Sequence, residues 1–100
     1  MADILMHPDD IAGDSEADLQ AAADMFIKIG LLRVGDRFIA DPLAEKVSDD
    51  DPDTNGPRSN CQKACDLAYE AAKVACNGSG NYSHCRKKAK KAWQACRILC

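Results

Sequence analysis

Two segments decide the fold: CQKACDLAYEAAKVAC (61–76) and CRKKAKKAWQACRILC (85–100) hold all six cysteines of this 100-residue chain, in mirror order. If each segment is helical, its three cysteines lie within about 60° of one another around the helix axis. When the two helices run antiparallel about the loop 77–84, the cysteines face each other at one common register. Of the pairings that six cysteines allow, one closes three rungs between straight antiparallel helices: Cys61–Cys100, Cys65–Cys96 and Cys76–Cys85.

The residues around the cysteines also favour a helical hairpin. Ser59 and Gln62 have the spacing of a capping box at the start of the first helix, Asn77 and the glycine after it can end that helix, and Ser83 can begin the second. Trp93 is the one large side chain expected at the edge of the seam between the helices. Small side chains between the rungs would let the helices approach to disulfide distance: Ala68, Ala72, Ala89 and Ala92.

Charge divides the chain into two unlike parts. Residues 1–56 contain 4 Lys+Arg and 14 Asp+Glu, a net charge of −10, whereas residues 57–100 contain 9 Lys+Arg and 2 Asp+Glu, a net charge of +7; together they give −3. Five aromatic residues against six cysteines indicate a small fold that relies on cross-links more than on a large core.

The boundary between these parts is the segment SDDDPDTNGPR (48–58), which we expect to be a flexible, exposed linker. Residues 1–47 are then an acidic leader, and residues 59–100 a cationic hairpin. An exposed linker is accessible to proteases, although it can equally be a spacer that is never cut. The N-terminal sequence has neither a basic region followed by an apolar stretch nor a membrane span, so we expect no Sec-type signal.

Within residues 1–47 the clearest element is an amphipathic helix. It is expected to begin after Ser15, to carry apolar side chains such as Phe26 at helical spacing, and to end at Gly30. A unit of this size without cross-links is near the lower limit for independent folding. We therefore expect it to be marginally stable and to be held weakly, if at all, to the C-terminal half.

The rest of this part is expected to form a β-hairpin and a short helix. LLRVGDRFIA (31–40) has two short apolar runs around Gly35-Asp36, a pattern typical of a tight hairpin turn. An Asp-Pro pair then favours a helix over residues 42–47. The fold class expected for the whole chain is mainly α, a disulfide-stapled antiparallel helical hairpin preceded by a helix–β-hairpin–helix segment.

That helix–hairpin–helix order resembles the end of a winged-helix domain over about thirty residues. It lacks a basic recognition helix, however, and a net charge of −10 repels DNA phosphates. We therefore expect no nucleic-acid partner.

The cysteines could also belong to a metal site or have a thiol-redox function, but their spacing argues against both. Cysteines at i and i+4 can share a zinc ion, but Cys76 is far from Cys65 and the chain has no C-x2-C knuckle. A thiol-redox function lacks a C-x-x-C motif. His7 and His84 are the two histidines, one near the terminus and one in the expected loop, and neither is paired with a nucleophile. We expect no enzyme activity, no cofactor and no metal.

The paired C-x3-C motifs, Cys61/Cys65 and Cys96/Cys100, resemble those of alpha-hairpinin defence peptides and helical-hairpin toxins. The resemblance covers about residues 59–100, with a longer separation between the motifs and a third rung. It implies an antimicrobial, protease-inhibitory or channel-blocking peptide. The inner four cysteines are also similar to the twin C-x9-C hairpins of the mitochondrial intermembrane space, with one residue more in each arm, which implies a non-catalytic adaptor or assembly factor.

The second helix is expected to carry a basic face away from its cysteines, made of Arg86, Lys87, Lys88, Lys90, Lys91 and Arg97. Leu67 and Val74 point outward from the first helix, and together with Trp93 they offer apolar contacts. A basic and apolar surface suits an anionic membrane or an acidic protein partner, although most charged helix faces are simply solvated. The acidic first half of the chain is itself such a partner.

The sequence therefore predicts a precursor of a cationic peptide, either antimicrobial or toxin-like. The acidic leader would keep the peptide inactive until a protease cuts the linker, and a dedicated exporter would secrete it by a non-Sec route. The alternative is an intact adaptor of the twin C-x9-C type in the mitochondrial intermembrane space. Mass spectrometry of the native protein, cut or uncut near residues 50–60, would distinguish the two.

Overall fold

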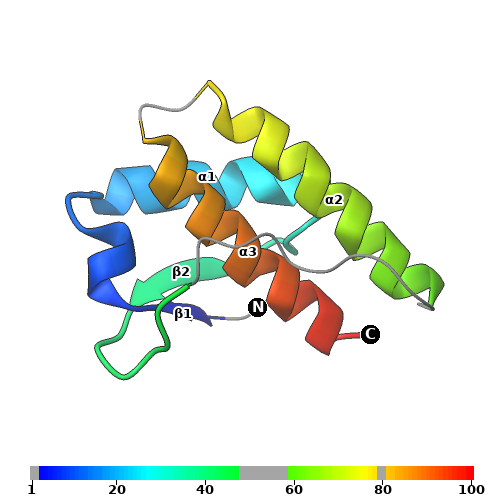
Figure 1. The fold of residues 1–100 in the computed structure, drawn as a ribbon, viewed down its shortest axis with the longest axis horizontal. Coiled ribbons are helices and arrows are strands. Elements are labelled where there is room, and N and C mark those ends of the chain that lie inside the picture. Colours follow the sequence, from blue (N-terminus) through cyan, green and yellow to red (C-terminus); the bar gives the residue numbers. More distant parts are fainter. Residues whose placement is uncertain (1–2, 48–58, 79–80) are drawn as a thin grey trace.

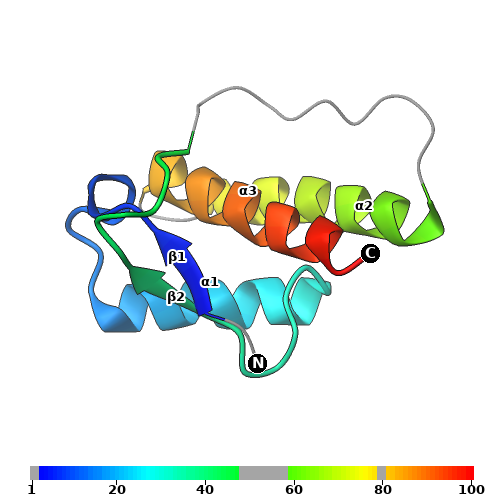
Figure 2. The ribbon, with the colours of Figure 1, turned by 90° about the horizontal axis from the view of Figure 1, so that it is seen from below.

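A computed structural model describes residues 3–47, 59–78 and 81–100, which form two packed layers (Figures 1 and 2). The helices α2 and α3 make one layer, and α1 with a pair of strands makes the other. The predicted linker 48–58 lies outside the described residues. The elements in chain order are β1 (Asp3–Met6), the 3-10 helix η1 (Pro8–Ile11), α1 (Glu16–Ile29), β2 (Arg37–Ala40), α2 (Asn60–Cys76) and α3 (Tyr82–Ile98).

The hairpin of α2 and α3 is stapled by three disulfides, as the mirror spacing of the cysteines predicts. The Cα–Cα distances are 5.7 Å for Cys61–Cys100, 5.9 Å for Cys65–Cys96 and 5.6 Å for Cys76–Cys85. The mainly helical fold class and the stapled hairpin are thus confirmed. In the chain-entropy description, cross-links that close loops of about ten to forty residues each stabilise a fold by about 3–4 kcal/mol, although nested loops do not add fully.

Local capping defines the helix ends. The capping box predicted for α2 is present, because the Gln62 N–H donates to Ser59 Oγ at 3.2 Å and the Ser59 N–H donates to Gln62 Oε1 at 3.3 Å. The expected cap of α3 at Ser83 is wrong by two residues: Asn81 Oδ1 accepts the N–H of His84 at 3.1 Å. His84 therefore lies inside the first turn of α3 and not in the loop.

The helix α1 also has the predicted ends. Ser15 Oγ accepts the N–H of Asp18 at 3.1 Å, and Asp18 Oδ2 accepts the N–H of Ser15 at 3.0 Å. The hydrogen bond from the Ser15 backbone N–H, followed by one from the Ser15 side chain, holds the pKa of the Asp18 carboxyl below its ordinary value. Gly30 ends the helix at a φ of 95°, a left-handed conformation that glycine adopts without steric cost.

The predicted β-hairpin over residues 31–40 is wrong. The two strands are parallel, β1 with β2, and pair Ile4 with Phe38 across the sheet. Parallel strands need a crossover connection, which α1 supplies. Residues 33–36 instead form a turn, in which the Asp36 carboxylate accepts the Arg33 N–H at 2.8 Å, so that β2 begins after the turn.

The short helix predicted over residues 42–47 is also wrong. Asp41 makes a single turn, because its backbone O accepts the Ala44 N–H at 3.0 Å and its Oδ1 accepts the Leu43 N–H at 2.9 Å. The N–H of Val47, which a helix would use internally, donates instead to Asp10 Oδ2 at 2.8 Å. A contact distant in sequence thus overrides a local helix preference.

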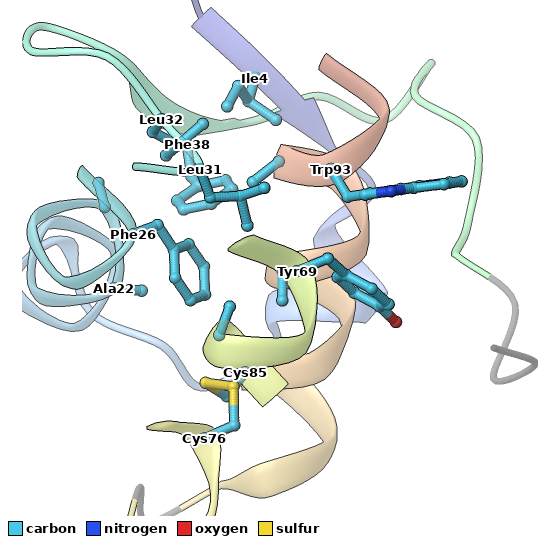
Figure 3. Close-up of a cluster of buried hydrophobic side chains, with 14 of the residues drawn as sticks. Ile4, Ala22, Phe26, Leu31, Leu32, Phe38, Tyr69, Cys76, Cys85 and Trp93 are labelled. Atoms are coloured by element: carbon cyan, nitrogen blue, oxygen red, sulfur yellow. A yellow bond between two sulfur atoms is a disulfide. The ribbon is translucent and has the colours of Figure 1, made fainter. Parts of the chain in front are cut away.

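Both layers contribute to one hydrophobic core (Figure 3). Phe26 is fully buried and meets Phe38 edge to face, with ring centroids 6.1 Å apart. On the hairpin, Tyr69 packs against Trp93 with centroids 5.8 Å apart. From the sequence, the N-terminal unit is expected to be held weakly, if at all, to the hairpin. This expectation is wrong, because the apolar side chains of residues 3–47 belong to the same buried cluster as those of α2 and α3.

Candidate functional site

The most unusual feature of the molecule is a buried ion pair between its acidic and basic parts. Lys88, in the middle of α3, places its Nζ atom 2.7 Å from Oδ2 of Asp14, which lies just before α1. Only 6% of the Lys88 side chain and 10% of the Asp14 side chain are exposed. Taking two charges out of water is costly unless each satisfies the other. The pair thus couples the docking of the N-terminal part to one lysine of the hairpin.

The same carboxylate reaches a second group of α3. Asp14 Oδ1 lies 3.3 Å from Nδ1 of His84, whose side chain is 16% exposed. Lys88 is one helical turn after His84, so both side chains lie on one face of α3. Asp14 therefore bridges two positions of the basic helix with its two oxygen atoms.

A second acidic residue of the N-terminal part makes a parallel contact. Asp10 at the end of η1 is 3% exposed, and its Oδ1 lies 3.4 Å from Nζ of Lys87. Its other oxygen accepts the N–H of Val47. Nearby, the Lys46 ammonium lies 2.9 Å from Asp9 and, by hydrogen bonding first and charge second, holds the pKa of that exposed carboxyl below its ordinary value. These contacts attach the end of the described N-terminal part to η1 and α3.

A cavity of about 480 Å³ adjoins the Asp14–Lys88 pair. Its walls come from the Gly13–Asp14 turn, from α1 as far as Met25 and from the start of α3, and they include Asp18 and Cys85. The two halves of the chain thus leave a hollow beside the ion pair that binds them together.

The six residues predicted to bind an anionic surface do not form one open basic face. Lys88 is buried against Asp14, and Lys87 is directed to Asp10. Two more carry their guanidinium groups over aromatic rings, Arg97 at 4.9 Å from the Trp93 centroid and Arg86 at 5.7 Å from the Tyr82 centroid. The five residues other than Lys88 are partly buried: Arg86, Lys87, Lys90, Lys91 and Arg97.

The three predicted apolar contacts also separate. Leu67 is 73% exposed and Val74 is 69% exposed on the outer face of α2, as expected. Trp93 is 7% exposed, so its proposed part in an outer apolar surface is wrong. Its indole N–H donates to Oδ1 of Asp66 at 2.6 Å, and its ring packs on Tyr69. Trp93 is therefore buried against α2, on the side of the hairpin away from Phe26 (Figure 3).

Replacing Trp93 with Phe should lower the free energy of unfolding by about 2 kcal/mol, because a buried hydrogen bond to a charged group contributes about 1.5–3 kcal/mol. Urea unfolding followed by circular dichroism would measure the loss. Tyr82→Phe is the matched control, since Tyr82 is 43% exposed. Equal stability of Trp93→Phe and the parent chain would show that the Trp93–Asp66 bond contributes nothing.

Several important residues were not found from the sequence. Asp10 and Asp14 read as two of many solvated acids, and Asp66 as one of two acids among nine bases. The opposite charges of the two halves predicted attraction but not which residues meet. Asp14 and Lys88 are 74 positions apart, so only the packed structure brings them together.

Comparisons with known proteins identify no relative: no family model, curated protein or solved structure matches the chain. Within the described residues, no helix has the length and apolar character that crossing a membrane requires. Three disulfides in a chain of this size fit an oxidising compartment. In the described ranges, the sulfur atoms of Cys61, Cys65 and Cys100 are the one group of possible metal ligands that lie within 4.8 Å of one another, and all three belong to disulfides.

Proposed function

We propose that the chain is a precursor whose acidic N-terminal part masks a cationic, disulfide-stapled hairpin. Cleavage within residues 48–58 would release a secreted peptide that acts on anionic membranes. The observation that carries this proposal is the burial of Lys88 against Asp14, which places the acidic part directly on the helix that bears most of the positive charge. A processing protease and a dedicated exporter are the partners that this function requires.

The surface that the N-terminal part covers is suited to a membrane. Residues 3–47 contact α3 through α1, η1 and β1, and they contact α2 through α1. Their removal would leave the hairpin with one face uncovered and would free the ammonium groups of Lys87 and Lys88. Adjacent apolar and cationic groups are what bind an anionic lipid surface.

Cleavage of the linker should weaken masking even if the two parts initially stay together. In the intact chain the acidic part competes with lipid as a tethered ligand, and tethering gives it an effective concentration on the order of millimolar. After cleavage this advantage disappears on dilution. The cut chain should therefore bind vesicles at concentrations at which the intact chain does not.

To test this, part of residues 48–58 is replaced by a specific protease site, and binding to phosphatidylglycerol vesicles is compared before and after cutting. We expect at least about tenfold tighter binding after cutting, which declines with added salt because exposed charges are screened over about 8 Å at physiological ionic strength. Phosphatidylcholine vesicles are the uncharged control. Equal binding by cut and intact chain would contradict the precursor.

A charge variant examines the binding surface of the cut chain. Lys91→Gln should weaken binding by about fivefold, since a basic residue near an anionic surface contributes about 1 kcal/mol. Lys63→Gln, on the exposed start of α2, is the control and should have a smaller effect. Lys88→Gln is unsuitable for this purpose because it would also remove the ion pair that docks the acidic part, so its effects on masking and on lipid binding could not be separated.

The exposed side chains of Leu67 and Val74 favour a second candidate, an intact adaptor that binds a protein partner through α2. Seven positions separate the two residues, so they lie on one helix face. This adaptor would act in the intermembrane space. It is favoured over the precursor if cutting does not change vesicle binding and if Leu67→Asp abolishes the biological activity of the uncut chain.

A further inference from the structure

The open end of the hairpin gathers four cysteines in one place. Cys61 and Cys65 lie one turn apart on α2, and Cys96 and Cys100 are the corresponding pair at the end of α3, each cross-linked to its partner across the seam. The sulfur atoms of Cys61, Cys65 and Cys100 lie within 4.8 Å of one another. The Sγ atoms of Cys65 and Cys100, which belong to different disulfides, are 3.8 Å apart.

One sulfur–sulfur distance at this end of the hairpin matches that in a tetrahedral zinc site. A zinc–thiolate bond is about 2.3 Å long, which places two sulfur atoms at the corners of a tetrahedron about 3.8 Å apart. The Cys65–Cys100 distance already has this length. Opening the two disulfides would let the bonded sulfurs separate to a similar distance, with no change in the register of the helices.

We propose that, when these two disulfides are reduced, Cys61, Cys65, Cys96 and Cys100 bind one zinc ion as a structural four-thiolate site. The reduction consumes two molecules of a dithiol reductant, each giving two electrons and two protons to one disulfide and becoming a disulfide itself. Zinc then replaces the four thiol protons, which are released to solvent. The expectation that the cysteines form disulfides and not a metal site holds for the oxidised chain, and the zinc site belongs to the reduced one.

The outer rung is the most accessible of the three disulfides, because Cys61 and Cys100 are both exposed. The two inner rungs are less accessible: Cys65 is 2% exposed, Cys76 0% and Cys85 5%, although Cys65 and Cys85 each line an open cavity. Full reduction therefore gives six thiols. Cys76 and Cys85 lie at the other end of the hairpin, so only the four thiols at its open end can share one ion.

The consequence is a hairpin that holds its register in both redox states. In a reducing compartment, where thiols persist, zinc would link the helices at their open end; in an oxidising compartment the disulfides would do so. This inference does not depend on the precursor proposal, because it concerns the four thiols alone.

Cobalt is the spectroscopic probe for this site. The full chain is reduced under anaerobic conditions with a phosphine and titrated with Co²⁺ and then Zn²⁺. We expect one Co²⁺ per chain, with the intense visible absorption of tetrahedral thiolate coordination, and its loss when an equivalent of Zn²⁺ is added. Binding should weaken as the pH falls, because protons compete for the thiolates. No tetrahedral absorption, or a stoichiometry other than one, would overturn the proposal.

Two variants separate this site from binding to any thiols. Cys65→Ala removes one ligand and should abolish the tetrahedral spectrum, whereas the double variant Cys76→Ala/Cys85→Ala should keep the spectrum at one ion per chain. Alkylation of the zinc-loaded chain, read by mass spectrometry, is independent of the spectrum: zinc should protect the four proposed ligands more than Cys76 and Cys85. An unchanged spectrum in Cys65→Ala, or equal protection of all six cysteines, would refute the four-thiolate site.

Discussion

Phe26→Ala is expected to lower the free energy of unfolding by about 3–5 kcal/mol, the usual loss when a buried Phe is truncated to Ala. The Phe26 ring is fully buried in α1, where it meets Phe38 and faces the hairpin layer (Figure 3). Truncation leaves a cavity between the layers and removes the aromatic pair. A small domain has a total stability of about 5–15 kcal/mol, so this loss is a large part of it.

The measurement is urea unfolding followed in two ways, by the fluorescence of Trp93 and by far-ultraviolet circular dichroism. Trp93 lies in α3, in the other layer, so it reports on the hairpin while the substitution is in α1. We expect both signals to shift together. Leu43→Ala is the control, because Leu43 is 92% exposed. A Trp93 transition unchanged by Phe26→Ala would show that the two layers unfold independently.

Asp14→Ala is expected to cost about 3–5 kcal/mol, because it leaves the buried Lys88 ammonium without its carboxylate. The loss should be largely insensitive to salt, since a buried pair is screened much less than an exposed one. Thermal or urea unfolding at low and high salt would measure it. Asp3→Ala is the control: Asp3 forms an exposed pair with Arg37 at 2.9 Å, and an exposed pair contributes little.

The double variant Asp14→Leu/Lys88→Met distinguishes the charge from the packing. Replacing both partners of a buried pair with apolar side chains is often neutral or stabilising, so this variant should recover most of the loss seen in Asp14→Ala. A double variant as unstable as the single one would show that Asp14 acts through His84 or through the turn before α1. In the precursor proposal, Asp14→Ala should also let the uncut chain bind anionic vesicles.

The sequence alone predicts the parts of this protein that local geometry controls. The helical period places three cysteines on one stripe of each arm, so the disulfide register follows from the spacing of residues along each arm and the requirement that facing residues meet. The ends of α1 follow from Ser15 and Gly30 for the same reason, since a cap contacts backbone atoms within a few residues. The division of charge between the two halves is likewise a property of composition.

The tertiary structure decided everything that depends on partners distant in the chain. β2 pairs with β1 and not with residues 31–34, because the Asp36 turn and the α1 crossover bring strands more than thirty positions apart together in parallel. Residues 42–47 form no helix because Asp10 takes the N–H of Val47. Lys88 is likewise buried by a residue distant in the chain, Asp14. Helical periodicity predicts the face of α3 on which Lys88 lies, but it does not predict which carboxylate covers that face. An acid 74 positions away determines that this lysine is buried in an ion pair, because only the folded chain brings Asp14 to α3.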